Sequence, residues 1–227
     1  SSDLPADIKN PSDIEVQTRT TWQTQTIAIR GVESHDGYTV ALFEQPYGTM
    51  AQNLSWNTAY NPSKSNTVYN VFEFLDEPGE FYFDRAEQKL YYWPREGEDM
   101  TTADVYAPNV DTLLRISGEN IMSHVSNIVI DGLTFANSDW NLYEIAGSHG
   151  KTSTQASLSL TSTASNWHYS AYRSVDLTPS AVEVQSADNI EFINNTIKHT
   201  ANDGLNVIND VSESKFEGNV IYDTGAT

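Results

Sequence analysis

A 24-residue repeat near the C-terminal end constrains the fold of this 227-residue chain more than any other feature of the sequence. Residues 189–197 and 213–221 align with each other, and residues 127–135 can be laid over both. A short apolar strand pattern precedes each aligned segment. Repeats of this length with several short strands are typical of a parallel β-solenoid, in which each coil adds one strand to each face.

The aligned positions predict how the coils stack. Phe192 matches Phe216, which places apolar side chains one above the other inside the solenoid. Asn195 matches Asn219 at a predicted turn, where stacked amides would bond backbone groups that the turn leaves open. We therefore expect an all-β fold with parallel β-helix coils over residues 106–227.

Residues 1–105 have a different pattern, which predicts a small antiparallel β domain. Two aromatic segments, residues 80–84 and 89–93, flank a short polar loop and follow a Pro-Gly turn, and this is a hairpin pattern. Residues 68–75 predict a further strand of the same domain.

A stretch rich in serine and threonine, residues 138–180, interrupts the repeat. A loop of this length inside a compact repeat is either functional or disordered, and its aromatic side chains favour a function. The residues that we expect to bind a sugar are His149, Gln155, Trp167 and His168. Anchoring of the loop is the alternative role for each of them.

The charge and composition of the chain exclude several classes of partner and site. The sequence contains 31 acidic and 12 basic residues, which give a net charge of −19. Nucleic acids and anionic membranes require a basic face, so neither is expected as a partner, and a neutral glycan fits better than an anionic one. The sequence has no cysteine, which excludes disulfides and thiolate metal sites. No apolar run approaches the roughly 18 residues of a membrane span.

Carboxylates beside the predicted strand at residues 204–207 are the candidate catalytic groups. Hydrolysis of a glycosidic bond uses two carboxyl groups, about 5 Å apart in a retaining enzyme and roughly 6.5–9.5 Å apart in an inverting one. Asp203 precedes this strand and Asp210 follows it, and Gly204 leaves room for a ligand. The two aspartates can serve one bond only if the backbone bends between them. Each could instead be a turn residue that bonds its own backbone.

Three further residues are alternative catalytic groups. Asp223 lies one period after His199, so the two should stack on adjacent coils, where the aspartate would orient the histidine or share its proton. An ordinary hydrogen bond between coils is the other interpretation. Glu183 is the outward residue of its strand and should stack near Asn206.

The sequence carries no metal motif. No pair of histidines has ligand spacing, and the aspartates do not follow the EF-hand pattern. We expect no cofactor. Calcium would be needed only if the chain were a polysaccharide lyase, for which Arg173 and Lys198 are the available basic residues.

Several motifs resemble those of bacterial right-handed parallel β-helix proteins. They are DEPGEFYFD at residues 76–84 with LYYWPR at 90–95, NPSDIE at 10–15 with Trp22, IDGLTF at 130–135, and GNVIYDTG at 218–225. The resemblance covers nearly the whole chain and implies a right-handed β-helix with a small β domain attached. Such proteins include secreted glycoside hydrolases, among them galactosidases, xylosidases and the lacto-N-biosidases of glycoside hydrolase family 136.

The resemblance implies an extracellular or cell-surface glycoside hydrolase that acts on a neutral glycan. In the lacto-N-biosidases the catalytic pair is two aspartates seven positions apart, which is the spacing of Asp203 and Asp210. The implied roles are nucleophile for Asp210 and acid/base for Asp203, with retention of configuration. A non-catalytic glycan- or protein-binding β-helix and a polysaccharide lyase remain as alternatives.

The last predicted coil presents an open strand edge at the C-terminal end of the solenoid. Only three or four coils are written in the sequence, and an open strand edge is normally capped or continued. We therefore expect the remainder of the same β-helix, or a companion chain, to cover this edge and to contribute part of the site.

Overall fold

The computed structural model describes residues 4–5, 7–19, 24–45, 48, 66–140, 150–153, 157–160 and 175–226, and for residues 150–153, 157–160 and 175–177 it describes the backbone. These residues form β-strands and two short 3-10 helices, arranged in several sheets without a closed barrel. The all-β prediction is therefore confirmed. No helix in this part of the chain is long and apolar enough to cross a membrane.

The chain forms two compact units. The first comprises residues 1–105, 145–154 and 158–176, and the second comprises residues 106–144, 155–157 and 177–227. Each unit has its own hydrophobic core.

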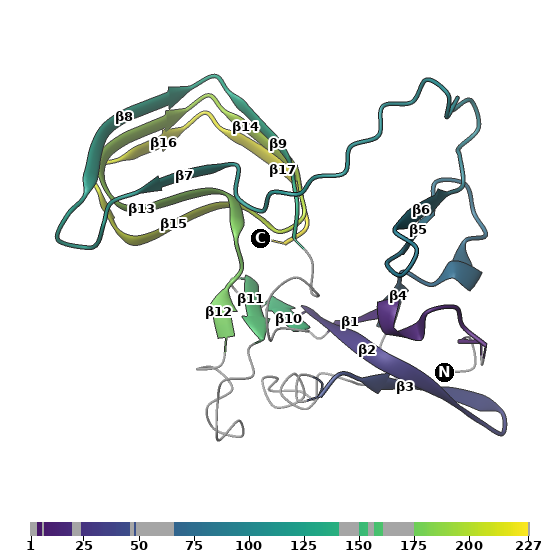
Figure 1. The fold of residues 1–227 in the computed structure, drawn as a ribbon. Helices are drawn as coiled ribbons and strands as arrows, with labels where there is room; N and C mark the ends of the chain where they lie inside the picture. The colour runs from purple at the N-terminus through teal and green to yellow at the C-terminus, as the bar shows by residue number, and fades with distance from the viewer. Residues whose placement is uncertain are drawn as a thin grey trace. The chain divides into compact units, whose positions relative to one another are not determined.

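The first unit is built on a seven-stranded sheet with the order β12-β11-β10-β2-β1-β4, in which β3 also pairs with β2 (Figure 1). Its strands are β1 (Glu15–Arg19), β2 (Thr24–His35), β3 (Tyr38–Phe43), β4 (Asn66–Tyr69), β10 (Gly150–Ser153), β11 (Ser157–Leu160) and β12 (Val175–Leu177). The last three come from the stretch that the sequence predicts as a loop. Strands of three or four residues are too short for periodicity to distinguish them from a loop.

The predicted aromatic hairpin is confirmed. Strands β5 (Phe81–Asp84) and β6 (Lys89–Tyr92) pair antiparallel, with Phe81 opposite Tyr92 and Asp84 opposite Lys89. Tyr82 is fully buried, whereas the nearby Trp93 is 45% exposed.

The strand predicted over residues 68–75 is only partly correct. β4 ends at Tyr69, and a 3-10 helix, η2 (Phe72–Phe74), follows. Asn70 lies between them with a φ of 58°, and its side chain donates to the carbonyl of Phe83 and accepts from the amide of Phe83. The chain turns here because Asn70 joins it to the hairpin, an interaction that local periodicity does not reveal. A second 3-10 helix, η1 (Pro11–Asp13), precedes β1.

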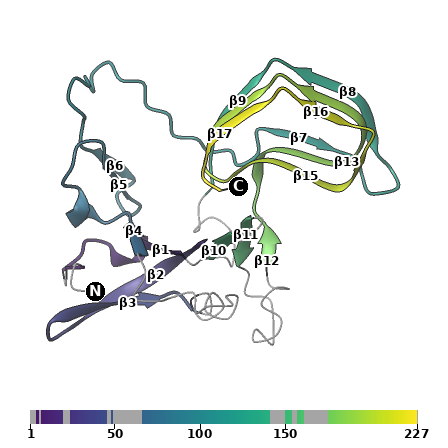
Figure 2. The ribbon, with the colours of Figure 1, turned by 180° about the vertical axis from the view of Figure 1, so that it is seen from behind.

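The second unit consists of three stacked turns of chain, which we call windings 1, 2 and 3 (Figures 1 and 2). Winding 1 contains β7 (Leu114–Ser117), β8 (Val125–Asp131) and β9 (Thr134–Ser138); winding 2 contains β13 (Ser180–Ile193) and β14 (Thr196–Thr200); winding 3 contains β15 (Asp203–Ser212), β16 (Lys215–Glu217) and β17 (Val220–Thr224). All pairings between windings are parallel, and winding 2 lies in the middle.

The register between windings 2 and 3 follows the 24-residue repeat. Phe192 lies opposite Phe216, and Ile197 lies opposite Ile221. The rings of Phe135, Phe192 and Phe216 form a row through all three windings, with centroids 5.9 and 6.1 Å apart. Phe192, in the middle, is fully buried. The alignment of these positions in the sequence is therefore confirmed.

The predicted asparagine ladder is also confirmed. Asn195 is fully buried, and its amide oxygen accepts a hydrogen bond from the backbone of Leu133 in winding 1 at 2.9 Å. The backbone amide of Asn195 in turn donates to the side chain of Asn219 in winding 3 at 2.8 Å. These bonds pair turn groups that parallel strands cannot reach.

Candidate functional site

The candidate catalytic residues of the sequence lie in the second unit, on strand β15 and its neighbours. Asp203 begins β15, opposite Ser180 of β13, and is 3% exposed. The polar residues Thr200 and Asn202, just before Asp203 in the sequence, and Thr178 and Ser180, one winding back, are also buried. Asp203 therefore belongs to a buried polar corner of the winding rather than to an exposed turn.

Gly204 does not provide room for a ligand beside Asp203. A Cβ atom added to Gly204 would lie 2.8 Å from Ile221 Cγ2 and 3.5 Å from Ile197 Cγ2. The glycine is required because the apolar interior of the winding is tightly packed at this point. Its role is packing, which corrects the interpretation from the sequence.

Asp210 lies at a bulge near the other end of β15. Ile208 pairs with Gln185 and Val211 pairs with Ala187, so two residues of β15, Asn209 and Asp210, lie opposite the single Ser186. Asn209 and Asp210 have φ values of 51° and 67°. Bulges re-aim side chains and are frequent next to active sites. The side chain of Asp210 is 58% exposed.

The straight part of β15 keeps Asp203 and Asp210 apart. β15 stays in register with β13 from Asp203 to Ile208, and this part spans roughly 17 Å at 3.3 Å per residue. Asp210 lies two residues further on, at most about 7 Å from Ile208, so the Cα atoms of the two aspartates are at least roughly 9 Å apart. This geometry favours a spacing wider than the roughly 5 Å of a retaining pair.

A histidine that the sequence analysis missed lies beside Asp210. His124 is 16% exposed, and its Nε2 atom is 3.5 Å from Asp210 Oδ2. Its Nδ1 atom is 2.8 Å from Asp188 Oδ2, and the other oxygen of Asp188 accepts a hydrogen bond from Ser212. His124 belongs to winding 1, Asp188 to winding 2, and Ser212 and Asp210 to winding 3, so the network joins all three windings.

The charges of this network shift two pKa values. The hydrogen bond to Asp188 raises the pKa of His124 above its ordinary value of 6.5 against the opposing effect of desolvation, and the negative charge of Asp210 acts in the same direction as Asp188. Hydrogen bonds from Ser212 and His124 hold the pKa of Asp188 below its ordinary value of 3.8. The pair is therefore an imidazolium and a carboxylate at mildly acidic pH.

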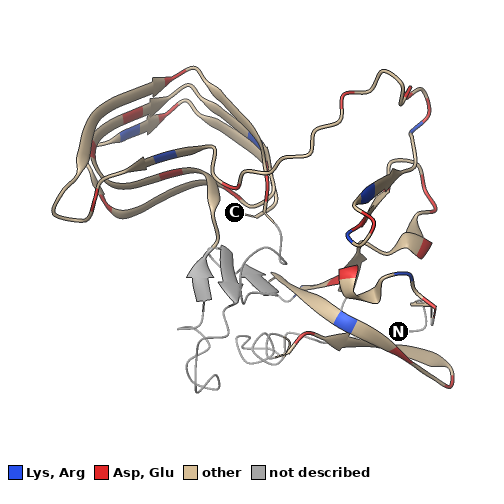
Figure 3. Ribbon diagram, viewed as in Figure 1, with Lys and Arg blue, Asp and Glu red and all other residues tan. Residues whose placement is uncertain are grey.

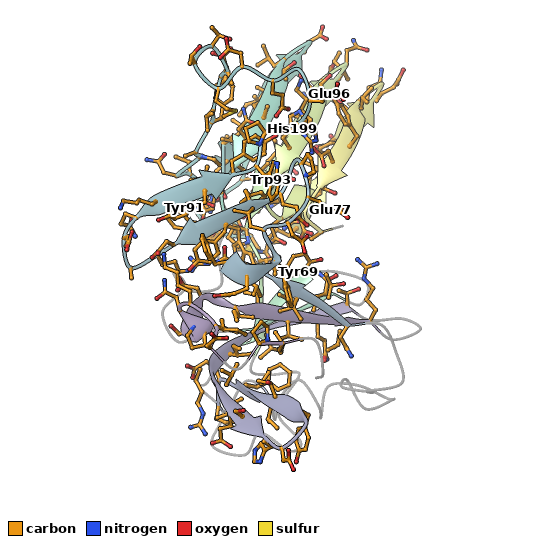
Figure 4. All side chains as sticks on the ribbon, turned by 90° about the vertical axis from the view of Figure 1, so that its right-hand side faces the viewer. Tyr69, Glu77, Tyr91, Trp93, Glu96 and His199 are labelled. Atoms are coloured by element: carbon orange, nitrogen blue, oxygen red, sulfur yellow. The ribbon has the colours of Figure 1, made fainter. Side chains whose placement is uncertain are left out.

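The stacking predicted for His199 and Asp223 is confirmed. His199 Nδ1 lies 2.5 Å from Asp223 Oδ2, one winding further on, and the ring of Tyr222 packs edge-on against the histidine. The side chains of His199 and Asp223 are 47% and 68% exposed, and His199 is labelled in Figure 4. This pair bonds two windings at the surface, and a catalytic role for it stays a prediction.

The stacking predicted for Glu183 is confirmed as well. Glu183 lies opposite Asn206 of winding 3 and Arg115 of winding 1. Its carboxylate is 3.1 Å from the Nε atom of Arg115. Glu183 is thus paired with the guanidinium of Arg115 across the two windings.

The expected sugar-binding residues lie outside the described part of the chain. They are His149, Gln155, Trp167 and His168. Among the residues that the structure does describe, no group of three or more histidine, aspartate or glutamate side chains could hold a metal ion.

The hairpin of the first unit holds a lysine among aromatic rings. Lys9 Nζ is 2.7 Å from the buried Asp84 and lies 5.1 to 6.0 Å from the ring centroids of Phe72, Tyr82 and Tyr91. Tyr91 is labelled in Figure 4. Cation–π contacts and the ion pair fix the N-terminal segment to the hairpin.

Comparison with known proteins relates the chain to glycoside hydrolases. Residues 3–95 match the family model described as GH141 insertion domain, which is less than half of the chain. No curated protein matches the sequence. One solved structure, named glycoside hydrolase, is similar with a TM-score of 0.63 and 21% sequence identity, over 87% of this chain and 35% of that one.

Residues 3–95 are thus similar to a domain of a glycoside hydrolase family. The structural likeness concerns the fold, and the chain spans about a third of the length of that glycoside hydrolase. Neither finding names a lacto-N-biosidase.

Proposed function

We propose that this chain is part of a secreted glycoside hydrolase whose windings belong to a right-handed parallel β-helix. The match of residues 3–95 to the GH141 insertion domain carries the proposal, and the likeness to a solved glycoside hydrolase over 87% of the chain supports the same class. A lacto-N-biosidase is the specific activity to test first. The prediction that further coils or a companion chain cover winding 3 is part of this proposal.

The substrate is a neutral glycan. The chain has a net charge of −19, and Figure 3 shows Asp and Glu spread over the strands and loops of both units with few Lys and Arg between them. The negative charge of the chain would repel an anionic polysaccharide, whereas it would neither attract nor repel an uncharged sugar. Substrate and enzyme would meet outside the cell or at its surface.

The chemistry uses a pair of carboxylates that includes Asp210. Asp210 is exposed, lies on a bulge and faces a histidine, so it is suited to act as nucleophile or base on an approaching sugar. Asp203 is the acid/base partner that the resemblance implies. The extended strand between them argues against the roughly 5 Å spacing of a retaining pair, so the stereochemistry of the product is informative.

The test is hydrolysis of 4-nitrophenyl lacto-N-bioside and of a panel of neutral 4-nitrophenyl monoglycosides by wild type, Asp203→Asn and Asp210→Asn. We expect each variant to lower kcat on the order of 100- to 10,000-fold, as for loss of a general acid or base. Rescue of Asp210→Gly by azide, with a glycosyl azide of inverted configuration as the product, would assign Asp210 as the nucleophile. The anomer first formed, read by NMR, separates retention from inversion.

Glu191→Gln is the matched control, because Glu191 lies on β13 and faces Lys215 in the neighbouring strand. It should keep full activity. Full activity of Asp203→Asn and Asp210→Asn would contradict the assignment of the pair. Glu183→Gln, Asp223→Asn and His199→Asn would then be tested as the alternatives.

A non-catalytic glycan-binding module is the second candidate. Polar side chains of the three windings form hydrogen bonds to one another on the outward face of the β7-β13-β15 sheet. Gln185, for example, donates to Ser117 and accepts from Asn209. Such rows present amides and hydroxyls that could bond sugar hydroxyls. Calorimetric binding of an oligosaccharide without any turnover would favour this function, and an unsaturated product would favour a lyase.

A further inference from the structure

The turn that precedes β8 brings a residue of winding 1 into line with the bulge of winding 3. Val125, Ala187 and Val211 lie opposite one another in the three windings. The residues immediately before them, His124, Ser186 and Asp210, therefore form one row across the stack. Ser186 in the middle is small and 4% exposed, so it leaves space for the histidine and the aspartate to approach each other across it.

The bulge aims Asp210 along this row. Winding 3 has one residue more than winding 2 between the paired segments, and the extra residue is accommodated with positive φ at both Asn209 and Asp210. The hydroxyl of Ser186 donates to the carbonyl of Asn209 at 3.1 Å, which fixes the bulge to winding 2. Positive φ at two successive non-glycine residues costs free energy, so the surrounding contacts must hold this conformation.

A second pair of contacts fixes the orientation of His124. Asp188 binds its Nδ1 atom, and Ser212 holds Asp188 from the other side. The Nε2 atom is buried and lies 3.5 Å from Asp210 Oδ2. A histidine that is oriented through one nitrogen presents the other to its reaction partner in a defined direction.

We propose that His124 is a positioning residue for Asp210, held in place by Asp188, and that it directs the Asp210 carboxylate towards the glycan. The role rests on the proposed hydrolase function. All the groups involved belong to this chain. Asp188 of winding 2 orients the imidazole of His124 in winding 1, and this imidazole contacts the carboxylate of Asp210 in winding 3.

The charged groups that face His124 are Asp188 from β13 and Asp210 from β15. The imidazolium form attracts both carboxylates, and the attraction to Asp210 weakens when the ring loses its proton. The positioning should therefore fail as the pH rises through the pKa of His124, which lies above 6.5.

The first experiment measures the pKa of His124 by NMR titration of the imidazole signals of the whole chain, which has five histidines. Spectra of His124→Asn assign the signal. We expect Asp210→Asn, an exposed and conservative change, to lower the pKa of His124, and Asp188→Asn to lower it as well. An unchanged pKa in Asp210→Asn would overturn the proposal, whatever the activity of the chain.

The second experiment measures kcat and KM with the 4-nitrophenyl glycoside that the wild type hydrolyses. His124→Asn should lower kcat on the order of 10- to 100-fold with KM almost unchanged, because misplacing a reacting group by about 1 Å costs about 100-fold. His35→Asn, which removes an exposed histidine 3.8 Å from Glu33, is the matched control and should keep both constants.

The outcomes separate the two proposals. Unchanged kcat in a folded His124→Asn variant would overturn the positioning role while leaving the hydrolase function intact. If the wild type hydrolyses no glycoside but Asp210→Asn lowers the pKa of His124, the proposed function fails, and the positioning role fails with it, although the contact stands.

Discussion

At the scale of single residues, asparagine side chains complete the hydrogen bonding of the turns between strands. Asn195 makes hydrogen bonds to winding 1 and to winding 3: its side chain binds the amide of Leu133 and the carbonyl of Ile130, and its backbone amide donates to the side chain of Asn219. Because Asn195 is fully buried, water cannot replace these bonds.

Asn195→Ala should therefore destabilise the fold strongly. The amide of Leu133 and the carbonyl of Ile130 would each lose a buried partner, and an unsatisfied buried group costs about 1–3 kcal/mol. The free energy of unfolding in urea, followed by circular dichroism, measures the loss. Gln185→Ala, which removes only exposed hydrogen bonds, should change it by less than about 0.5 kcal/mol. Equal losses of unfolding free energy in the two variants would show that the asparagine ladder does not stabilise the fold.

The network around His124 should make stability depend on pH. The raised pKa of His124 means that its contribution is complete below pH 6.5 and is lost as the pH rises through the raised value. The lowered pKa of Asp188 means that its contribution is complete above pH 3.8 and is lost as the pH falls through the lowered value.

The difference in the free energy of unfolding between wild type and His124→Gln should thus be largest from about pH 4 to 6.5 and shrink above that range. Urea unfolding at a series of pH values checks this. The same series with His35→Gln, which removes an exposed histidine outside this network, is the control. A difference that grew with pH would have the wrong sign for this network.

At the scale of elements, β13 organises the second unit, because it pairs with strands of winding 1 on one side and winding 3 on the other. Val184 of β13 and Ile197 of β14 are completely buried, whereas the residues opposite them in winding 3, Val207 and Ile221, are 44% and 45% exposed. The same apolar position thus contributes more in the middle winding than in the outer one.

The phenylalanine row tests this difference. Phe192→Ala should cost about 3–5 kcal/mol, as for other fully buried aromatic residues. Phe216→Ala, one winding further on in the same row and only partly buried, should cost clearly less. Thermal and urea unfolding of both variants measure the two costs. A larger loss for Phe216→Ala would contradict the lower burial of Phe216.

At the scale of the whole molecule, the excess of 31 acidic over 12 basic residues opposes compaction. Ion pairs such as Lys9 with Asp84 and Arg115 with Glu183 use several of the few basic groups. The acidic residues outnumber the basic ones by 19, so repulsion among carboxylates is not fully compensated, and salt reduces this repulsion.

The melting temperature at pH 7 should rise when sodium chloride is increased from about 10 to 300 mM, because the screening length falls from about 30 Å to well below 10 Å. Differential scanning fluorimetry measures it. The rise should shrink as the pH approaches the isoelectric point of about 4.3, where the net charge vanishes. A melting temperature that falls with salt at pH 7 would mean that attractive ion pairs outweigh the repulsion.

The 24-residue repeat is sufficient to predict the contacts between windings 2 and 3, where no insertion interrupts it. The match of Phe192 with Phe216, the ladder of Asn195 and Asn219, and the pairing of His199 with Asp223 all follow from a 24-residue spacing between windings 2 and 3. A constant number of residues per winding fixes the register, because each rung must advance by the same amount.

Contacts between windings that an insertion or a bulge separates in the sequence become visible only in the folded chain. His124 and Asp188 are 64 residues apart, because the stretch at residues 138–180 separates winding 1 from winding 2, and no spacing in the sequence marks them as neighbours. The bulge that aims Asp210, the burial of Asp203 and the packing role of Gly204 depend on contacts between windings. Side-chain direction across a stack is set by the neighbouring strands, and these are distant in the chain.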